Sequence, residues 1–159
     1  MKKVTITRLR VLEIVNNADK LKSLQGVKLT YAISKNLKAL KAEVEAMQES
    51  NKPSEEMQKY NDACNELVIA EAKRDDKGEF IPAGPNQIVL KDASAYKAKR
   101  SELDEKYKDE IEKAKVKNAE FDILLKEPFE FEFYQVQSEF ISEEITCEQM
   151  DLILEMVKE

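Results

Sequence analysis

A stripe of apolar residues dominates the second half of the chain. Its members recur at steps of three, four or seven, with almost only Lys, Arg, Glu and Asp between them: Tyr96, Leu103, Tyr107, Ile111, Ala114, Phe121 and Leu125. This spacing predicts one face of a long helix that begins near Asp92 or Ser94, runs towards Lys126 and is closed by Pro128. Because such a face must be covered by another helix or a sheet, the chain has to build a helical body.

Four further helices are expected from the same kind of pattern. The clearest covers residues 28–49, with apolar positions at Leu29, Ile33, Leu37, Leu40, Val44 and Met47. A short helix capped by Thr7 runs through Leu9, Leu12 and Val15. A third starts at Ser54 and continues to about Arg74, with its inward positions at Met57, Tyr60, Cys64, Leu67 and Val68. The last follows a capping box from Thr146 to Gln149 and turns inward Met150, Ile153, Leu154 and Val157.

Strand signals are few and short. Residues 4–7 alternate β-branched side chains, and residues 129–136 alternate apolar and polar ones, which is the strongest strand pattern in the chain. The first segment is basic and the second acidic, so we expect the two to pair. Residues 75–78 read as a turn, residues 79–81 as a strand stub and residues 87–91 as a returning strand. Pro82, Gly84 and Pro85 are expected to prevent regular structure between them.

These elements predict a mainly α fold with a small β element. It is an elongated antiparallel helical hairpin or bundle, in which a short sheet joins the N-terminal and C-terminal strands. Hydrophobic residues make up 42% of the chain and there are only 3 Gly and 4 Pro, a balance that favours helix. Its 159 residues suit a single domain, 1–159, with a hairpin-like excursion at about residues 75–91.

The composition argues against several kinds of chemistry. The chain has no His, no glycine-rich phosphate loop and no spacing typical of a metal site, so we expect no catalytic residues, no cofactor and no metal. Cys64 and Cys147 lie inside expected helices, where reduced core residues are commoner than a disulfide. No segment resembles a signal peptide or a membrane span. We therefore expect a cytoplasmic protein, in the host cell if it is encoded by a phage.

The net charge of −6 hides a strong asymmetry. Residues 1–41 contain ten Lys and Arg against two acidic residues, whereas residues 127–159 contain ten Asp and Glu against Lys158 alone. The basic segment can pair with the acidic one inside the fold, or it can meet an external acidic protein or nucleic acid. Charge pattern alone leaves both interpretations open.

One candidate binding face lies on the helix expected over residues 28–49. Lys28, Tyr31, Lys35 and Lys38 project within about 80° of one another, opposite the apolar stripe. Lysines interleaved with a tyrosine can hold phosphates and stack a ring, or can form an ordinary solvated face. Asn36 lies at the edge of the stripe, and we expect its amide to bond to backbone or to a neighbouring loop and so fix how the helix docks.

A family resemblance rests on these same residues. The run Val-Lys-Leu-Thr-Tyr-Ala-Ile-Ser-Lys-Asn-Leu-Lys at residues 27–38, then Glu43, Tyr60 and the turn at residues 73–78, resembles a family of small phage and prophage proteins. Its members carry a Tyr-x-Ile-x-Lys-Asn-Leu helix followed by a helical hairpin with an Asp-x-x-Gly turn. The matching positions are Tyr31, Lys35 and Asn36, and the resemblance covers the first half of the chain. It implies a viral accessory protein and assigns no role to these residues.

Three functions follow as hypotheses. The first is a non-enzymatic phage accessory protein that binds another macromolecule, a host or phage protein above all, for example to inhibit an antiviral defence factor. The second is a self-associating structural or assembly protein of the virion. The third is a protein that binds or sequesters a small anion such as a nucleotide, held by Lys28, Tyr31, Lys35 and Lys38. Nucleic acid is a weaker partner than protein, and no membrane partner is expected.

Overall fold

The computed structural model describes residues 1–158 and divides the chain into two compact units. Unit 1 holds Met1–Lys52 and the chain from Ala119 onward, and unit 2 holds Pro53–Asn118. The single domain expected from the sequence stays a prediction.

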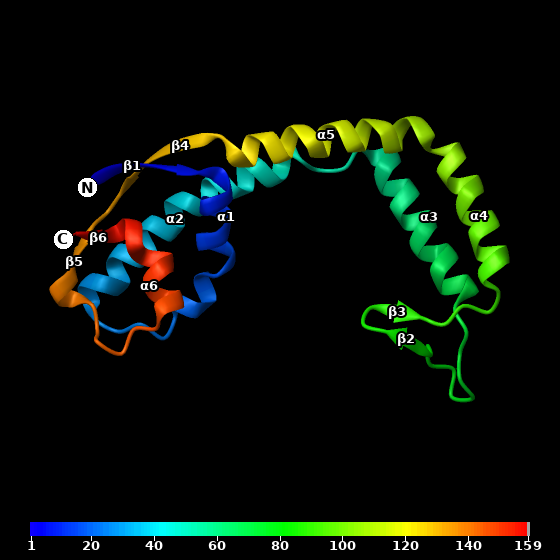
Figure 1. Ribbon diagram of the computed structural model, residues 1–159, viewed down its shortest axis with the longest axis horizontal. Coiled ribbons are helices and arrows are strands. Elements are labelled where there is room, and N and C mark those ends of the chain that lie inside the picture. Colours follow the sequence, from blue (N-terminus) through cyan, green and yellow to red (C-terminus); the bar gives the residue numbers. More distant parts are fainter. Residues whose placement is uncertain (159) are drawn as a thin grey trace. The chain divides into compact units, whose positions relative to one another are not determined.

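The described part of the chain is mainly helical, with short strands, as the apolar spacing predicts (Figure 1). In chain order its elements are β1 Lys2–Thr7, α1 Arg8–Asn16, η1 Ala18–Leu21, α2 Val27–Ser50, α3 Glu55–Glu71, β2 Pro82–Gly84, β3 Gln87–Ile88, α4 Ala93–Lys106, α5 Lys108–Lys126, β4 Pro128–Phe133, β5 Val136–Gln137, η2 Ser138–Phe140, α6 Cys147–Ile153, η3 Leu154–Met156 and β6 Val157–Lys158. The mainly α fold class with a small β element is confirmed.

In unit 1, the expected sheet joins the basic and acidic strands. β1 and β4 pair antiparallel, with Lys3 opposite Glu132 and Val4 opposite Phe131. In Figure 1 they lie side by side near the N-terminus. Alternation places the charged residues on the exposed face and the apolar ones against the core. A second, parallel pair, β5 with β6, brings the chain end to the segment that follows β4.

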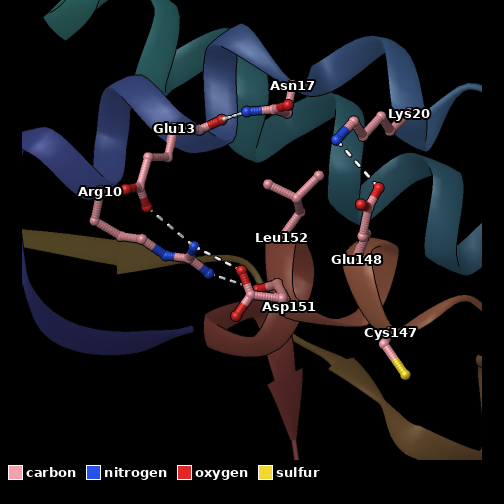
Figure 2. Close-up of a pocket in the computed structure, with 8 residues that line it drawn as sticks. All are labelled: Arg10, Glu13, Asn17, Lys20, Cys147, Glu148, Asp151 and Leu152. Carbon is pink, nitrogen blue, oxygen red and sulfur yellow. Dashed lines mark hydrogen bonds and ion pairs between the residues drawn. The ribbon is translucent and has the colours of Figure 1, made fainter.

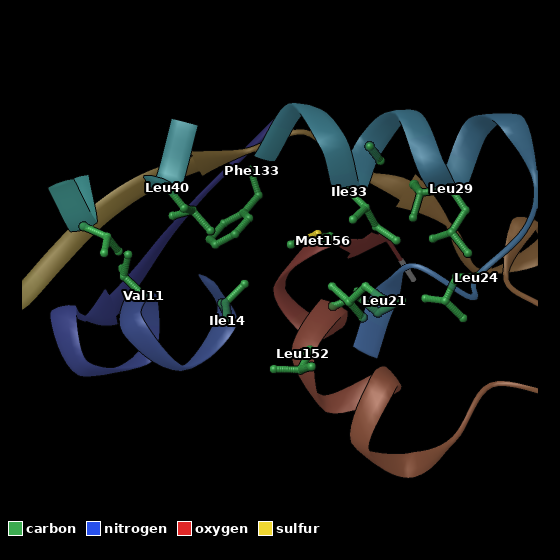
Figure 3. Packing of buried hydrophobic residues seen from close by; sticks show 14 of the residues in the cluster. Val11, Ile14, Leu21, Leu24, Leu29, Ile33, Leu40, Phe133, Leu152 and Met156 are labelled. Atoms are coloured by element: carbon green, nitrogen blue, oxygen red, sulfur yellow. The ribbon is translucent and has the colours of Figure 1, made fainter. Parts of the chain in front are cut away.

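The core of unit 1 is built on the predicted apolar stripe of α2. Five of the six stripe residues are buried, namely Leu29, Ile33, Leu40, Val44 and Met47. Facing them are fully buried side chains of α1, β4 and the last turn of the chain (Figure 3): Val11, Ile14, Phe133, Ile153 and Met156. Burying a side chain of this size contributes about 1.5–3 kcal/mol, so this cluster supplies most of the driving force for folding unit 1.

Two inward faces differ from the prediction. In α1, the expected residues Leu12 and Val15 are partly buried and pack against the core, but Leu9 is 45% exposed, and the fully buried residues are Val11 and Ile14. At the chain end, Leu154 was expected inward and is 59% exposed. The reason is that α6 ends at Ile153 and continues as the 3-10 turn η3, which has fewer residues per turn and turns Met156 inward instead.

Unit 2 is an antiparallel pair of helices, α3 and α4 (Figure 1). Tyr60 and Cys64 are the buried residues of α3, on its predicted inward face. The Tyr60 hydroxyl donates to Asp104 Oδ1 at 2.7 Å, and Arg100 donates both to that hydroxyl at 2.8 Å and to Asp104 at 3.0 Å. Burial and the bond to Asp104 raise the pKa of Tyr60 to about 12. The same hydrogen bonds lower the pKa of Asp104.

The long helix expected from Asp92 to Lys126 is wrong in one respect, because it is interrupted at Tyr107. The backbone there has φ −108° and ψ 18°, so α4 ends at Lys106 and α5 begins at Lys108. No Pro or Gly marks this place in the sequence. At this position the ring of Tyr107 packs on that of Tyr60, with the two ring centroids 5.6 Å apart. The start is as predicted, because the Asp92 side chain caps α4.

The excursion between α3 and α4 is a small hairpin. β2 and β3 pair antiparallel, and isolated bridges link Ala72 with Leu90 and Arg74 with Phe80. The expectation that Pro82 prevents regular structure was wrong, since Pro82 begins β2. A two-stranded ribbon has open edges where the missing N–H of proline costs nothing. Helix α3 also stops at Glu71 rather than near Arg74, because Ala72 is extended and joins the hairpin.

Candidate functional site

The first three turns of α2 carry three of the four predicted binding residues, Lys28, Tyr31 and Lys35. The helix begins at Val27 after Gly26, whose φ of 105° favours glycine. Gly26 has no side chain with which to cap the helix, and the positive end of the helix dipole lies here. Val27 is 87% exposed and Tyr31 is 55% exposed. This end of α2 is therefore basic and aromatic, and it is open to solvent.

Asn36 fixes the chain that follows β4 against this part of α2. Its Nδ2 donates to the Tyr134 carbonyl at 2.8 Å, and its Oδ1 accepts from the Tyr134 N–H at 2.8 Å. Asn36 is only 2% exposed, so both bonds are shielded from water. The prediction that this amide bonds to a neighbouring segment and fixes how the helix docks is confirmed.

The anchored segment places two more aromatic rings beside the lysines. The ring of Tyr134 meets that of Tyr31 edge-to-face, with centroids 5.3 Å apart. Lys35 Nζ lies 4.6 Å from the centroid of Tyr134, and Lys28 Nζ lies 3.7 Å from that of Phe140. Each cation–π contact at such an exposed site contributes about 0.5–1 kcal/mol. The two ammonium groups are thus held in place beside aromatic rings.

Between these groups lies a cavity of about 390 Å³, a size typical of ligand sites. We call it the aromatic–lysine pocket, and its lining residues are Val27, Lys28, Tyr31, Tyr134, Gln135, Val136, Gln137 and Phe140. Val136 is 4% exposed, and its apolar side chain also belongs to the core cluster of unit 1. The pocket therefore combines apolar and aromatic walls with amide side chains and the positive charge of Lys28. Lys35 lies outside the lining, with its Nζ over the ring of Tyr134, which forms one wall.

Lys28 and Lys35 form no ion pair within residues 1–158. Other members of the basic segment do pair with the acidic end of the chain. Arg10 Nη1 lies 2.9 Å from an Asp151 oxygen, and Lys20 Nζ lies 3.1 Å from a Glu148 oxygen. Pairing between the basic and the acidic segment inside the fold thus occurs at these residues, whereas an external acidic partner stays a prediction. The lysines of the aromatic–lysine pocket keep their charge available to an outside anion.

Lys38 does not join the other three predicted residues. It lines a separate cavity of about 530 Å³ whose lining residues all belong to α2: Ser34, Leu37, Lys38, Lys41, Ala42 and Glu45. Of the four predicted residues, Lys28 and Tyr31 line the aromatic–lysine pocket, and Lys35 lies beside it over the ring of Tyr134. A binding role for the four residues stays a prediction.

A further cavity, of about 590 Å³, lies between α1 and α6 (Figure 2). Its charged groups already have partners, since Arg10 pairs with Asp151 and with Glu155, and Lys20 with Glu148. Burial alone would lower the pKa of Arg10, but the hydrogen bonds and attraction of Glu155 and Asp151 outweigh it and raise that pKa. Because these charged side chains pair with one another, we interpret them as contacts that hold α6 on α1 rather than as a binding site.

The two cysteines are free, and they differ in exposure. Cys64 is buried in unit 2, as expected of a core residue. Cys147 is exposed, so the expectation of a core residue was wrong there, and in Figure 2 its thiol points away from the paired groups. Its position as the first residue of α6, after the cap Thr146, places it at the surface.

Within residues 1–158, no group of three or more His, Cys, Asp or Glu side chains is arranged to hold a metal ion. In the same part of the chain, no helix has both the length and the apolar character needed to cross a bilayer.

Sequence reasoning missed the residues that complete the pocket, above all Tyr134 and Phe140. Tyr134 lies within the alternating pattern of residues 129–136 and Phe140 follows it, and that alternation predicts a strand rather than a binding role. One indication of these residues is present in the sequence, namely Asn36, because a buried amide on α2 needs a hydrogen-bond partner in a neighbouring segment. The sequence did not show which segment that is.

Comparisons of the chain with models of protein families, with curated proteins and with solved structures found no match in any of the three. The resemblance to small phage and prophage proteins stays a prediction.

Proposed function

We propose that this is a non-enzymatic accessory protein of the phage type, which acts by binding another macromolecule through the aromatic–lysine pocket. The observation that carries the proposal is the pair Lys28 and Lys35, which have no ion-pair partner in the described chain. Lys28 lines a pocket with apolar walls, and Lys35 lies over the ring of Tyr134, which is one of those walls. Large exposed apolar side chains beside unpaired charge are typical of surfaces that dock a partner.

The partner class that we propose is a protein of the host, with inhibition of an antiviral defence factor as one form of the activity. The phage-type resemblance of residues 27–38 motivates this choice. The absence of His from the chain and of any recognisable nucleophile and base set supports a binding role over an enzymatic one.

Quantitative affinity purification from the host tests the proposal. The full-length protein is used as bait beside two double variants of α2, Lys28→Glu with Lys35→Glu and, as a matched control, Lys38→Glu with Lys41→Glu. Both variants change the same number of charges on exposed faces of one helix. We expect one stoichiometric partner that the first variant loses and the control retains. A partner retained equally by both variants, or none recovered at several salt concentrations, would overturn the proposal.

Self-association is a second candidate function, favoured by a different observation. Val116 of unit 2 is 59% exposed, and Ile123 of unit 1 is 63% exposed. In an assembly protein, a second copy covers such apolar side chains. Light scattering over a range of concentrations tests this: a mass that rises with concentration in the native chain and falls back in Val116→Lys with Ile123→Lys supports it. A strict monomer contradicts it.

A further inference from the structure

The aromatic–lysine pocket has a chemistry that narrows its ligand, and the following inference rests on the proposed function. We propose that the pocket takes a short acidic peptide segment of the partner protein, in which an apolar side chain enters the pocket and carboxylates on either side of it meet Lys28 and Lys35.

The spacing of the two lysines sets the spacing of the acids. Lys28 and Lys35 are seven residues apart on α2, which is about 10 Å along the helix axis. An extended peptide advances about 3.3 Å per residue, so two acidic residues three positions apart span the same distance. The uncapped start of α2 adds the positive end of a helix dipole on the Lys28 side.

The pocket walls favour an apolar side chain between those acids. Val27 and Tyr31 are large apolar side chains that solvent reaches, and Val136 joins them in the lining. Covering such side chains removes apolar surface from water, and tyrosine is among the residues that contribute most where partners dock. The amides of Gln135 and Gln137 also line the pocket and can both donate to and accept from a peptide backbone.

Nucleic acid fits this site less well than a peptide. Stacking of a base needs an open ring face, but ammonium groups already lie over Phe140 and Tyr134, at 3.7 and 4.6 Å from their centroids. A polyanion also needs a continuous basic track, whereas exposed Glu139, Glu143 and Glu144 follow in the same segment of the chain. A peptide with two carboxylates meets both lysines without such a track.

Nuclear magnetic resonance on the ¹⁵N-labelled full-length protein tests the inference with defined probes. The probe is the hexapeptide acetyl-Ser-Glu-Leu-Ala-Glu-Ser-amide, and its matched control replaces both Glu by Gln. Oligothymidylate and ATP are titrated in parallel. We expect the acidic peptide to shift the amide signals of Tyr31, Val136 and Gln137, to bind at least tenfold more tightly than the Gln peptide, and to weaken as salt is added.

The variants described above supply the controls. Lys28→Glu with Lys35→Glu should abolish the shifts while the rest of the spectrum keeps its dispersion, and Lys38→Glu with Lys41→Glu should leave binding unchanged. The inference is overturned if the Gln peptide binds equally well, if no pocket signal shifts, or if oligothymidylate or ATP binds more tightly than the acidic peptide.

The two proposals fail separately. A host partner captured through Lys28 and Lys35, with no binding of the acidic peptide, overturns the ligand class and leaves the proposed function standing. Binding of the acidic peptide, with no host partner that depends on Lys28 and Lys35, supports the ligand class and overturns the proposed function.

Discussion

Asn36 and Tyr134, 98 residues apart in the sequence, exchange two hydrogen bonds of 2.8 Å in the interior of unit 1. Through this pair an amide on α2 satisfies both backbone groups of one residue in the segment after β4. In a sheet these two backbone groups would bond to the backbone of a neighbouring strand, whereas here one side-chain amide bonds to both. It also sets the position of the Tyr134 ring, and therefore of one wall of the aromatic–lysine pocket.

Replacing Asn36 by Leu should destabilise unit 1 and disturb the pocket. The change leaves the N–H and carbonyl of Tyr134 without partners, at a cost of about 2 kcal/mol. Urea unfolding followed by circular dichroism measures the loss. Asn118→Ala, at an exposed position of α5, is the control and should change the free energy of unfolding by less than about 0.5 kcal/mol. Equal stability of the two variants would show that the paired hydrogen bonds contribute nothing.

Arg10 should be irreplaceable by lysine. Its side chain is 18% exposed and donates to Glu155 and Asp151 at 2.9 Å each, an arrangement that uses the guanidinium fork. We expect Arg10→Met to lower the free energy of unfolding by about 2–3 kcal/mol, because it strands the Glu155 carboxylate, and Arg10→Lys to restore only part of that loss.

Thermal and urea unfolding measure these effects. Lys22→Met removes an exposed pair with Asp19 and is the matched control, with an expected change within about 0.5 kcal/mol. A lysine variant as stable as the native protein would contradict the need for the fork.

The end of α6 offers a test in two adjacent residues. Ile153 is fully buried, whereas Leu154 is 59% exposed. Ile153→Ala should therefore cost about 2–5 kcal/mol by leaving a cavity, and Leu154→Ala less than about 0.5 kcal/mol. The comparison uses unfolding midpoints under identical conditions. A large loss at Leu154 as well as at Ile153 would match the inward face expected from the sequence and contradict the observed one.

Tyr60 should make unit 2 sensitive to alkaline pH. Its pKa in the folded state is raised to about 12. In the unfolded chain a tyrosine ionises near pH 10, so its contribution to stability is fully present below about pH 10 and is lost as pH rises towards about 12. We expect the stability advantage of the native protein over Tyr60→Phe to be about 1 kcal/mol near pH 8 and to shrink at about pH 11.

Urea unfolding of both proteins at the two pH values measures this difference. Tyr60→Phe removes only the hydroxyl group. It keeps the ring that packs on Tyr107 and the ion pair of Arg100 with Asp104, so the difference between the two proteins reports on that hydroxyl. An advantage that stays constant over this range would mean that the Tyr60 hydroxyl is not held in the protonated form by its surroundings.

The sequence was most informative where a regular period meets a single buried face. The spacing of Leu29, Ile33 and Leu40 predicts α2, and the capping box from Thr146 to Gln149 predicts the start of α6. The alternation after Pro128 predicts β4, and opposite charge predicts its pairing with β1. In each case the signal is local, because it comes from side chains within one or two turns or from a two-residue repeat.

Where the sequence was wrong, contacts distant in the chain decided the outcome. Tyr107 interrupts a helix without any Pro or Gly, where its ring packs on Tyr60, 47 residues away in the numbering. Leu154 is exposed because the last turn tightens to bury Met156 in a core made by other elements. Helical period alone cannot foresee either result, since both depend on which neighbour fills the space.

The candidate site divides in the same way. The spacing of Lys28, Tyr31 and Lys35 predicts that they lie together on α2. Asn36 is polar and lies at the edge of the apolar stripe, which predicts that its amide has a hydrogen-bond partner in another segment. Tyr134 and Phe140 could not be assigned to the pocket from the sequence, because they are about a hundred residues away from α2 along the chain and contact it only in the folded unit. The period of a helix or strand can be recognised from residues that are close in the sequence. The residues that line a pocket depend on how the whole unit packs, so only the tertiary structure shows which ones they are.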